Sequence, residues 1–196
     1  MMRSEDGIAA VLIARKAIVG EVTFDRDRKE IELSNNDPTG VFVTINTFPA
    51  LRLRGCIGFP GPAYPLRDAV ENAARAACHD PRFLDLDADE LNDIVVEVTI
   101  LSPPEPIKVT DRKDLLDMIK LGKHGLMLEY RGRRSVFLPQ VPEEWGWDVK
   151  EYLENLCVKA GVGKNKWKEH DCNLMWFEGH VFKETSPNGD VAEVKE

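Results

Sequence analysis

The sequence predicts an α+β fold, a mixed or antiparallel sheet with flanking helices. β-branched segments and segments with helical spacing follow one another irregularly along the 196 residues, without the strict alternation of a doubly wound parallel sheet. Short turn sequences between extended segments indicate hairpins. Hydrophobic residues make up 43% and charged residues 31% of the chain, a composition that excludes a disordered protein. At this length we expect one domain over residues 1–196.

The first half of the chain predicts two helices and a pair of adjacent strands. Apolar residues recur at helical spacing over residues 4–19. Residues 40–46 are a β-branched strand, and residues 51–59 resume extended character, so we expect these two segments to pair. An alanine-rich helix follows, from residue 65 or 66 to residue 78. It should end before Pro81, because a residue that precedes proline is pushed out of the α region.

The second half mixes short strands with helices in the same way. The same signals predict a strand at 94–101, a short helix at 111–121, a hairpin of 126–130 with 135–138, a helix at 148–160, a strand at 175–182 and a polar tail at 184–196 that frays.

Charge and motif content exclude several classes of function. The chain has 26 Lys and Arg against 34 Asp and Glu, a formal net charge of −8, which argues against binding of a nucleic-acid backbone. The basic segments 131–134 and 159–168 lack the aromatic spacing of an RNA-recognition motif. We therefore expect no nucleic-acid partner. Because nucleotide-binding and serine-hydrolase motifs are absent too, we expect no cofactor.

The cysteine pattern indicates a reducing compartment. Four cysteines stand far apart without a CxxC pair, at positions 56, 78, 157 and 172. Cys78-His79 and His170-x-Cys172 are of ligand type but lack zinc-site spacing, so we expect no metal. The sequence shows no targeting segment and no stretch long enough to cross a bilayer. We expect a cytoplasmic protein with free thiols and no membrane partner.

The most unusual local sequence is LRGCIG at residues 53–58. Gly55 and Gly58 bracket Cys56, so the backbone there could approach a ligand closely, and the charge of Arg54 would favour a thiolate. A second interpretation is structural. Glycines also mark bulges and tight strand crossings, and a free cysteine is commonly a small buried apolar residue.

Several separated segments together resemble one protein family. They are LRGCIG at 53–58, DPRF at 80–83, EVTIL at 97–101, HGL at 124–126, LPQV at 138–141 and LCVKAG at 156–161. In this order they are similar to the AMMECR1 family, over a core of about residues 8–182. Any one segment would be weak evidence, but their agreement in order is specific. Thr99 stands where the family more often has serine.

The resemblance implies a fold of two unequal lobes, with the motif residues near a cleft between them. It implies no reaction, because the family has no established biochemical activity. Prokaryotic members are frequently fused to, or encoded beside, a Memo-like protein and a radical S-adenosylmethionine (radical-SAM) protein. Proteins of these two kinds are therefore candidate partners.

We expect an enzyme, or an enzyme component, that acts on a small substrate in a cleft centred on Cys56. Cys56 would be the nucleophile or redox-active thiol, and Arg54 would support its charge or clamp an anionic substrate. His79, His124 or Glu97 would be the base. Gly55, Gly58, Asp80, Arg82 and Gln140 would line the substrate site.

Each of these residues also has a structural interpretation. Glu97 is an outward charge if its face of the sheet is solvated, and it needs a partner such as Arg54 or Arg82 if it is buried. Asp80 and Arg82 fit a helix stop with a surface ion pair, and Gln140 fits a residue that satisfies local backbone groups. The whole motif also fits a non-catalytic adaptor or binding module that recognises a partner without chemistry.

Overall fold

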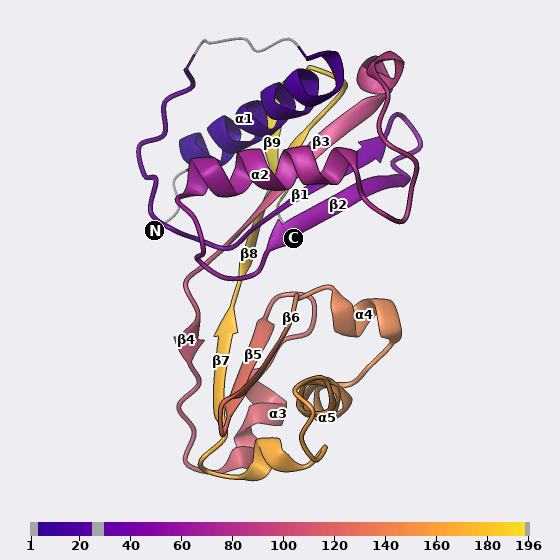
Figure 1. Cartoon of the computed structure of the whole chain (residues 1–196). Coiled ribbons are helices and arrows are strands. Elements are labelled where there is room, and N and C mark those ends of the chain that lie inside the picture. Colours follow the sequence, from indigo (N-terminus) through magenta and orange to yellow (C-terminus); the bar gives the residue numbers. More distant parts are fainter. Residues whose placement is uncertain (1–3, 25–29, 195–196) are drawn as a thin grey trace. The chain divides into compact units, whose positions relative to one another are not determined.

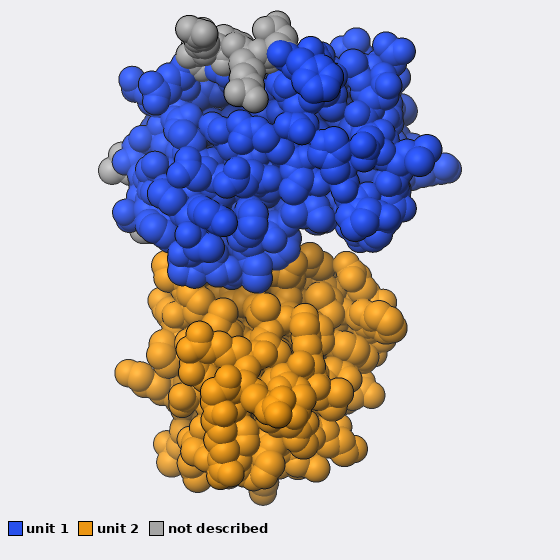
Figure 2. All heavy atoms as spheres, viewed as in Figure 1, with its two compact units in different colours: residues 1–101, 180–196 blue, residues 102–179 orange. Residues whose placement is uncertain are grey.

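The computed structural model describes residues 4–24 and 30–194. The chain forms two compact units, residues 1–101 with 180–196 (unit 1) and residues 102–179 (unit 2), coloured separately in Figure 2. Each unit combines helices with a sheet whose strand pairs are antiparallel, so the α+β class is confirmed. The cleft stays a prediction. No helix among the described residues is long and apolar enough to cross a membrane.

Unit 1 is built on a five-stranded sheet with the strand order β2-β1-β3-β8-β9 (Figure 1). Its strands are β1 (Val41–Thr47), β2 (Leu53–Phe59), β3 (Ile94–Leu101), β8 (Gly179–Glu184) and β9 (Val191–Val194). The predicted pairing of the first two strands is confirmed, and β1 also pairs antiparallel with β3.

Two helices, α1 (Ser4–Thr23) and α2 (Leu66–Cys78), lie side by side over one face of this sheet (Figure 1). Successive side chains of a strand point to opposite faces. Val43 and Ile45 therefore point toward the helices and are fully buried, together with most apolar residues of α1 and α2. The opposite face carries Thr44, Cys56, Glu97 and Lys183 (the polar face), whose side chains are half-buried.

The prediction of a fraying tail after residue 184 is wrong within the described residues. β9 pairs antiparallel with β8, Val191 opposite Glu184 and Val194 opposite Val181. The turn between them closes with a hydrogen bond from the Thr185 N–H to the Asp190 carbonyl, 2.8 Å. Polar side chains on this segment predicted disorder, but backbone pairing with a neighbouring strand does not depend on apolar side chains.

Unit 2 contains a four-stranded sheet with the strand order β4-β7-β5-β6. Its strands are β4 (Glu105–Pro106), β5 (Gly125–Tyr130), β6 (Arg133–Phe137) and β7 (Asn173–Phe177). Its helices are η2 (Arg112–Asp114), α3 (Leu115–Met118), α4 (Val141–Trp145), α5 (Val149–Lys159) and η3 (Lys166–Lys168). A further short helix, η1 (Ala88–Asn92), belongs to unit 1. The buried face of α5 packs against the buried side chains of β5. The predicted helix 148–160 is confirmed as α5, and Asp148 caps it in a capping box with Glu151.

Two predicted elements of the second half are wrong in extent. The predicted helix 111–121 is only η2 and the single turn α3, because Ile119 is extended and the chain turns at Gly122, whose φ is 75°. The predicted strand 175–182 is two strands in different sheets, β7 and β8. Between them lies Glu178, which forms two hydrogen bonds with Ser102. The Ser102 N–H donates to the Glu178 carbonyl at 2.8 Å, and the Glu178 N–H donates to the Ser102 hydroxyl at 2.9 Å.

Candidate functional site

Cys56 lies in the middle of β2 on the polar face of the unit 1 sheet. Thr44 of β1 is its register partner, and the Thr44 hydroxyl donates a hydrogen bond to Cys56 Sγ, 3.2 Å away. Glu97 of β3 is the partner of Thr44 on its other side. Lys183 Nζ of β8 lies 3.7 Å from Glu97 Oε2. These four residues form a continuous row across four neighbouring strands, which we call the cross-strand row.

The backbone of Cys56 is held by an ion pair from the segment after α2. The Cys56 N–H donates to Asp80 Oδ2 at 2.8 Å, and Arg82 Nη2 donates to the Cys56 carbonyl at 3.2 Å. Asp80 and Arg82 also bond to each other, with Nη2 to Oδ2 at 2.7 Å and Nε to Oδ1 at 3.0 Å. β2 is an edge strand, so the pair satisfies two backbone groups that its missing neighbour would have bonded.

Asp80 is buried, with 2% of its surface exposed. The guanidinium of Arg82, followed by backbone N–H donors, holds the pKa of the Asp80 carboxyl well below its usual range. A buried carboxylate with this many donors is a positioning group. Its predicted role in lining the substrate site has no support, because both of its oxygens are occupied by Cys56 and Arg82.

The prediction that Arg54 supports a Cys56 thiolate is wrong. Arg54 Nε and Nη2 bond to the two carboxylate oxygens of Glu90 at 2.8 Å, and its other donors reach the carbonyls of Leu84 and Asp85. The β1–β2 register shifts at this point, so Arg54 is the extra residue of a bulge. It therefore fastens the 84–90 segment to β2.

The surroundings of Cys56 favour the neutral thiol over the thiolate. Partial burial raises the pKa of Cys56, and the hydrogen bond from Thr44 and the charge of Arg82 oppose that rise without cancelling it. The protonated thiol is therefore the resting form at neutral pH. A nucleophilic role for this residue requires a base.

Glu97 is the acidic residue nearest to this thiol along the row. Its partner is Lys183, and not Arg54 or Arg82 as predicted. Burial raises the pKa of Glu97, and the charge of Lys183 opposes that shift. A carboxyl group whose pKa is raised toward neutrality can accept and return a proton, which is what a general base or acid does. The role of Glu97 as the base, one of the three candidates that the sequence offered, stays a prediction.

The structure does not bring His79 to the cross-strand row. His79 follows α2, and its two ring nitrogens each lie 3.1 Å from a carboxylate oxygen, one of Glu21 and one of Asp85. The hydrogen bond that His79 donates to the Glu21 carboxylate is the main cause that raises the pKa of His79. His79 is therefore a surface residue engaged by two acids, and this geometry gives no support to its prediction as the base.

The remaining predicted residues, His124 and Gln140, belong to unit 2. His124 is buried against Trp176, with ring centroids 4.7 Å apart, and its Nδ1 accepts from the Lys120 N–H at 3.2 Å. Burial lowers the pKa of His124, which keeps the ring neutral. Gln140 is exposed at the start of α4, where its carbonyl accepts from the Glu144 N–H. Their predicted roles stay predictions.

The two glycines of the motif are explained by packing. A Cβ at Gly55 would collide with the carbonyl oxygen of Ala77 in α2, and a Cβ at Gly58 would collide with the Val41 carbonyl and the Phe42 ring. The interpretation of tight strand and helix crossings therefore accounts for both residues. Their predicted contact with a substrate has no support from this geometry.

Sequence reasoning missed two members of the cross-strand row, Thr44 and Lys183. Period-two alternation along residues 41–47 places Thr44 on the face opposite Val43. That signal identifies the face, but the partner across the sheet depends on strand register. Lys183 falls between the predicted strand 175–182 and the predicted tail 184–196, so the sequence assigned it to neither.

The described residues contain no group of three or more His, Cys, Asp or Glu side chains arranged to hold a metal. The four cysteines are free, and all except Cys56 are buried. Burial raises the pKa of Cys78 to about 12 and that of Cys172 to about 11. Cys56 is thus the thiol of this chain with access to a reagent.

Comparison with known proteins gives a consistent result. The AMMECR1 family model matches residues 11–182. Protein MJ0810 of Methanocaldococcus jannaschii is 43% identical over 201 residues, and the match covers 100% of this chain and 98% of the length of MJ0810. Protein MK0488 of Methanopyrus kandleri is 41% identical, covering 96% of this chain and 93% of its own.

A solved structure is similar over the same extent. The crystal structure of the uncharacterized protein PH0010 from Pyrococcus horikoshii has a TM-score of 0.79 and 37% sequence identity. It covers 100% of this chain, and this chain covers 99% of it. Both sequence and fold agree over the full length, and the chain therefore belongs to the AMMECR1 family.

Proposed function

We propose that this protein is an enzyme, or a component of one, that acts on a small substrate at a cleft centred on Cys56. The observation that carries this proposal is the fixation of Cys56. An ion pair holds its N–H and its carbonyl, and a threonine hydroxyl bonds its sulfur, while the thiol stays partly exposed. Reacting groups in enzymes need this degree of positioning.

In the proposed step, Cys56 Sγ forms a bond to an electrophilic carbon of the substrate, and the bond from that carbon to its leaving group breaks. For this step the Thr44 hydroxyl, which donates to Cys56 Sγ at rest, rotates so that it accepts the thiol proton and passes its own proton to Glu97 of the neighbouring strand. Glu97 then delivers that proton to the leaving group. No oxidant or reductant is needed. Removal of the product from sulfur by water or a second acceptor restores the thiol.

The remaining residues act by positioning. Asp80 and Arg82 hold the Cys56 backbone, and Lys183 stabilises the ionised form of Glu97. We assign Arg54 to holding the 84–90 segment beside β2. The proposal includes a cytoplasmic location and a Memo-like or radical-SAM protein as partner; the partner rests on family resemblance.

The test incubates the full chain with a small-molecule extract of cells that encode a relative, with and without the two candidate partner proteins. Mass spectrometry follows both the small molecules and the intact protein. We expect mass changes in the extract and an adduct on Cys56, both lost in Cys56→Ser and kept in Cys78→Ala, which alters a buried thiol away from the row. Retention of the same changes by Cys56→Ser would overturn the proposal.

The rival proposal is a binding module without chemistry. The raised pKa of Cys56 favours it, because a protonated thiol is a poor nucleophile. In this case Arg82→Glu or Arg54→Glu should weaken capture of a Memo-like or radical-SAM partner in a pull-down, while Cys56→Ser should bind as the wild type does. Equal capture by all variants would contradict this rival.

A further inference from the structure

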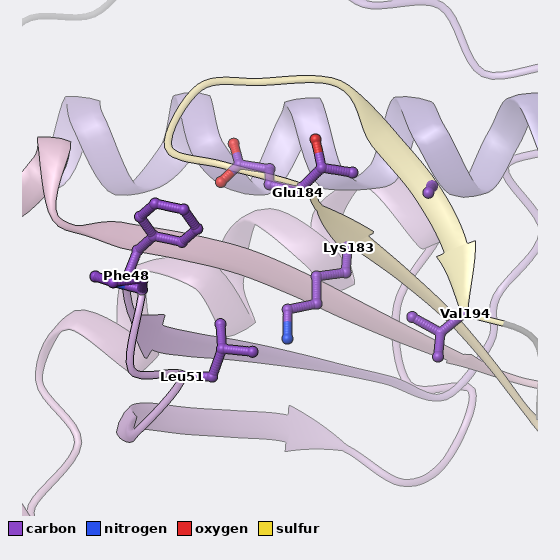
Figure 3. A pocket seen from close by; sticks show the side chains of 8 residues that line it. Phe48, Leu51, Lys183, Glu184 and Val194 are labelled. Atoms are coloured by element: carbon purple, nitrogen blue, oxygen red, sulfur yellow. The ribbon is translucent and has the colours of Figure 1, made fainter.

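Unit 1 has a second feature, a pocket whose lining shares Lys183 with the cross-strand row but does not include Cys56. This pocket of about 320 Å³ lies between the 48–51 turn, the end of β8 and β9. Figure 3 shows it from close by, with the Lys183 stem extending over the sheet between Leu51 and Val194. The lining is Phe48, Pro49, Leu51, Lys183, Glu184, Thr185, Ala192 and Val194. This volume is at the lower end of the range for small-molecule sites.

The apolar side chains of this pocket are exposed on a rigid support. Leu51 is 50% exposed, Val194 49% and Phe48 38%. The turn that carries Phe48 and Leu51 is closed by hydrogen bonds from the Thr47 N–H to the Arg52 carbonyl and from the Leu51 N–H to the Thr47 carbonyl, both 2.8 Å. The apolar surface is thus held open and cannot fold away into the core.

Leu51 also has strained backbone geometry. Its φ is 52°, in the left-handed region that a leucine rarely adopts. Strain of this kind persists where surrounding contacts enforce it, and it is concentrated at ligand clamps and active sites. Here it directs an apolar side chain into the pocket lining and away from the core.

Lys183 is the charged group of this pocket that can bind a ligand. Of the two charged lining residues, Glu184 is buried and already engaged: its carboxylate accepts bonds from Arg15 of α1 and from the Val96 N–H. Lys183 has the single long contact of 3.7 Å with Glu97. Its ammonium therefore has donors for another acceptor. A single lysine matches a singly charged anion, whereas a dianion would need further cations.

We propose that this pocket binds a small apolar carboxylate, whose apolar body contacts Phe48, Leu51 and Val194 and whose carboxylate accepts hydrogen bonds from Lys183. The site does not depend on a reaction at Cys56. It lies on the polar face of the same sheet, at the end of the cross-strand row that is farthest from the thiol.

Three probes of one shape test this inference: 4-phenylbutyrate, 4-phenylbutanol and 4-phenylbutylamine. Each is titrated into the full chain and followed by amide NMR shifts. We expect 4-phenylbutyrate to shift amides of 47–52, 183–185 and 191–194 saturably. Its Kd should be about tenfold lower than that of the alcohol, as one charge-assisted hydrogen bond provides, and the amine should bind most weakly.

Variants separate the two parts of the site. Leu51→Ser should weaken binding of all three probes, whereas Leu84→Ser, at an 87% exposed leucine of the same unit, should change none. Lys183→Met should make acid and alcohol bind alike, and Lys164→Met in unit 2 should not. Glu97→Gln should strengthen binding of the acid, because it removes the competing carboxylate. Equal binding of the three probes, or saturable shifts elsewhere only, would overturn the proposal.

Discussion

The Thr44 hydroxyl and the Cys56 sulfur lie 3.2 Å apart, across directly opposed positions of β1 and β2. Thr44 also opposes Glu97 on its other side. Thr44 therefore stands in the strand between the partly exposed thiol of Cys56 and the half-buried carboxyl of Glu97. This relationship makes the cross-strand row testable at several points.

Removing the Thr44 hydroxyl should slow the alkylation of Cys56. The hydrogen bond from Thr44 opposes the rise of the Cys56 pKa, so Thr44→Val should raise that pKa further and reduce the thiolate fraction. We expect the iodoacetamide rate at pH 8 to fall below that of the wild type, because less of the thiol is present as thiolate. Thr44→Ser keeps the hydroxyl and should react as the wild type does. The measurement is a pH–rate profile of labelling by mass spectrometry, and a profile unchanged in Thr44→Val would refute the assigned bond.

Loss of the Asp80 charge should destabilise unit 1 in a pH-dependent way. The folded pKa of Asp80 is lowered, so its contribution is complete above the pKa of the unfolded chain, about 3.9, and is lost as pH falls below it. Asp80→Asn should lower the free energy of unfolding at pH 7 by about 1–3 kcal/mol. The difference from wild type should shrink as pH is lowered from 4 toward 2.

Urea unfolding at pH 7, 5 and 3 measures this effect. Asp89→Asn, an exposed acidic position in η1, is the matched control and should change stability by less than about 0.5 kcal/mol. A difference for Asp80→Asn that persists unchanged to low pH would point to lost packing instead of lost charge.

A methyl group at Gly55 should be poorly tolerated. It would meet the carbonyl oxygen of Ala77, a backbone atom inside α2 that cannot move without shifting the helix. Gly55→Ala should therefore destabilise the protein by about 1–3 kcal/mol. Gly61→Ala is the matched control, because its Cβ would meet nothing within 4 Å. Thermal unfolding compares the two, and equal melting temperatures would contradict this packing.

Neutralising Glu97 should stabilise the protein above acidic pH. The folded pKa of Glu97 is raised by burial, so the folded state binds more protons than the unfolded state over the interval between the two pKa values. Stability from this group falls as pH rises through that interval, starting near the unfolded value of about 4.3. We expect Glu97→Gln to exceed wild-type stability at pH 7 and to match it below pH 4. Chemical unfolding at both pH values checks the sign.

Much of the secondary structure could be predicted from local pattern. The alanine-rich helix is α2, and Asp148 begins α5, because spacing and capping act over a few residues. The prediction fails where a segment changes partners. Residues 175–182 have continuous strand character, yet they join two sheets, since Glu178 bonds to Ser102, which is distant in sequence.

The residues of the candidate site were likewise predictable only where a local sequence pattern marked them. The LRGCIG motif identified Cys56 as a candidate, and the β-branched run of residues 94–101 identified Glu97, because a cysteine between glycines and an acid among β-branched residues are local irregularities. The role of Arg54 was wrong because a one-residue bulge sends its side chain to Glu90, 36 positions away. No local pattern encodes that contact.

By itself the sequence determined the family, the α+β class and the cysteine chosen as the candidate thiol, since these depend on composition, short-range spacing and ordered motifs. The tertiary structure decided which side chains meet that thiol. Strand register set Thr44 opposite it and Glu97 one strand further along the row. The segment after α2 supplied Asp80 and Arg82, and β8 supplied Lys183 at the end of the row. Register and loop packing join residues far apart in the chain, and only the folded backbone fixes those pairings.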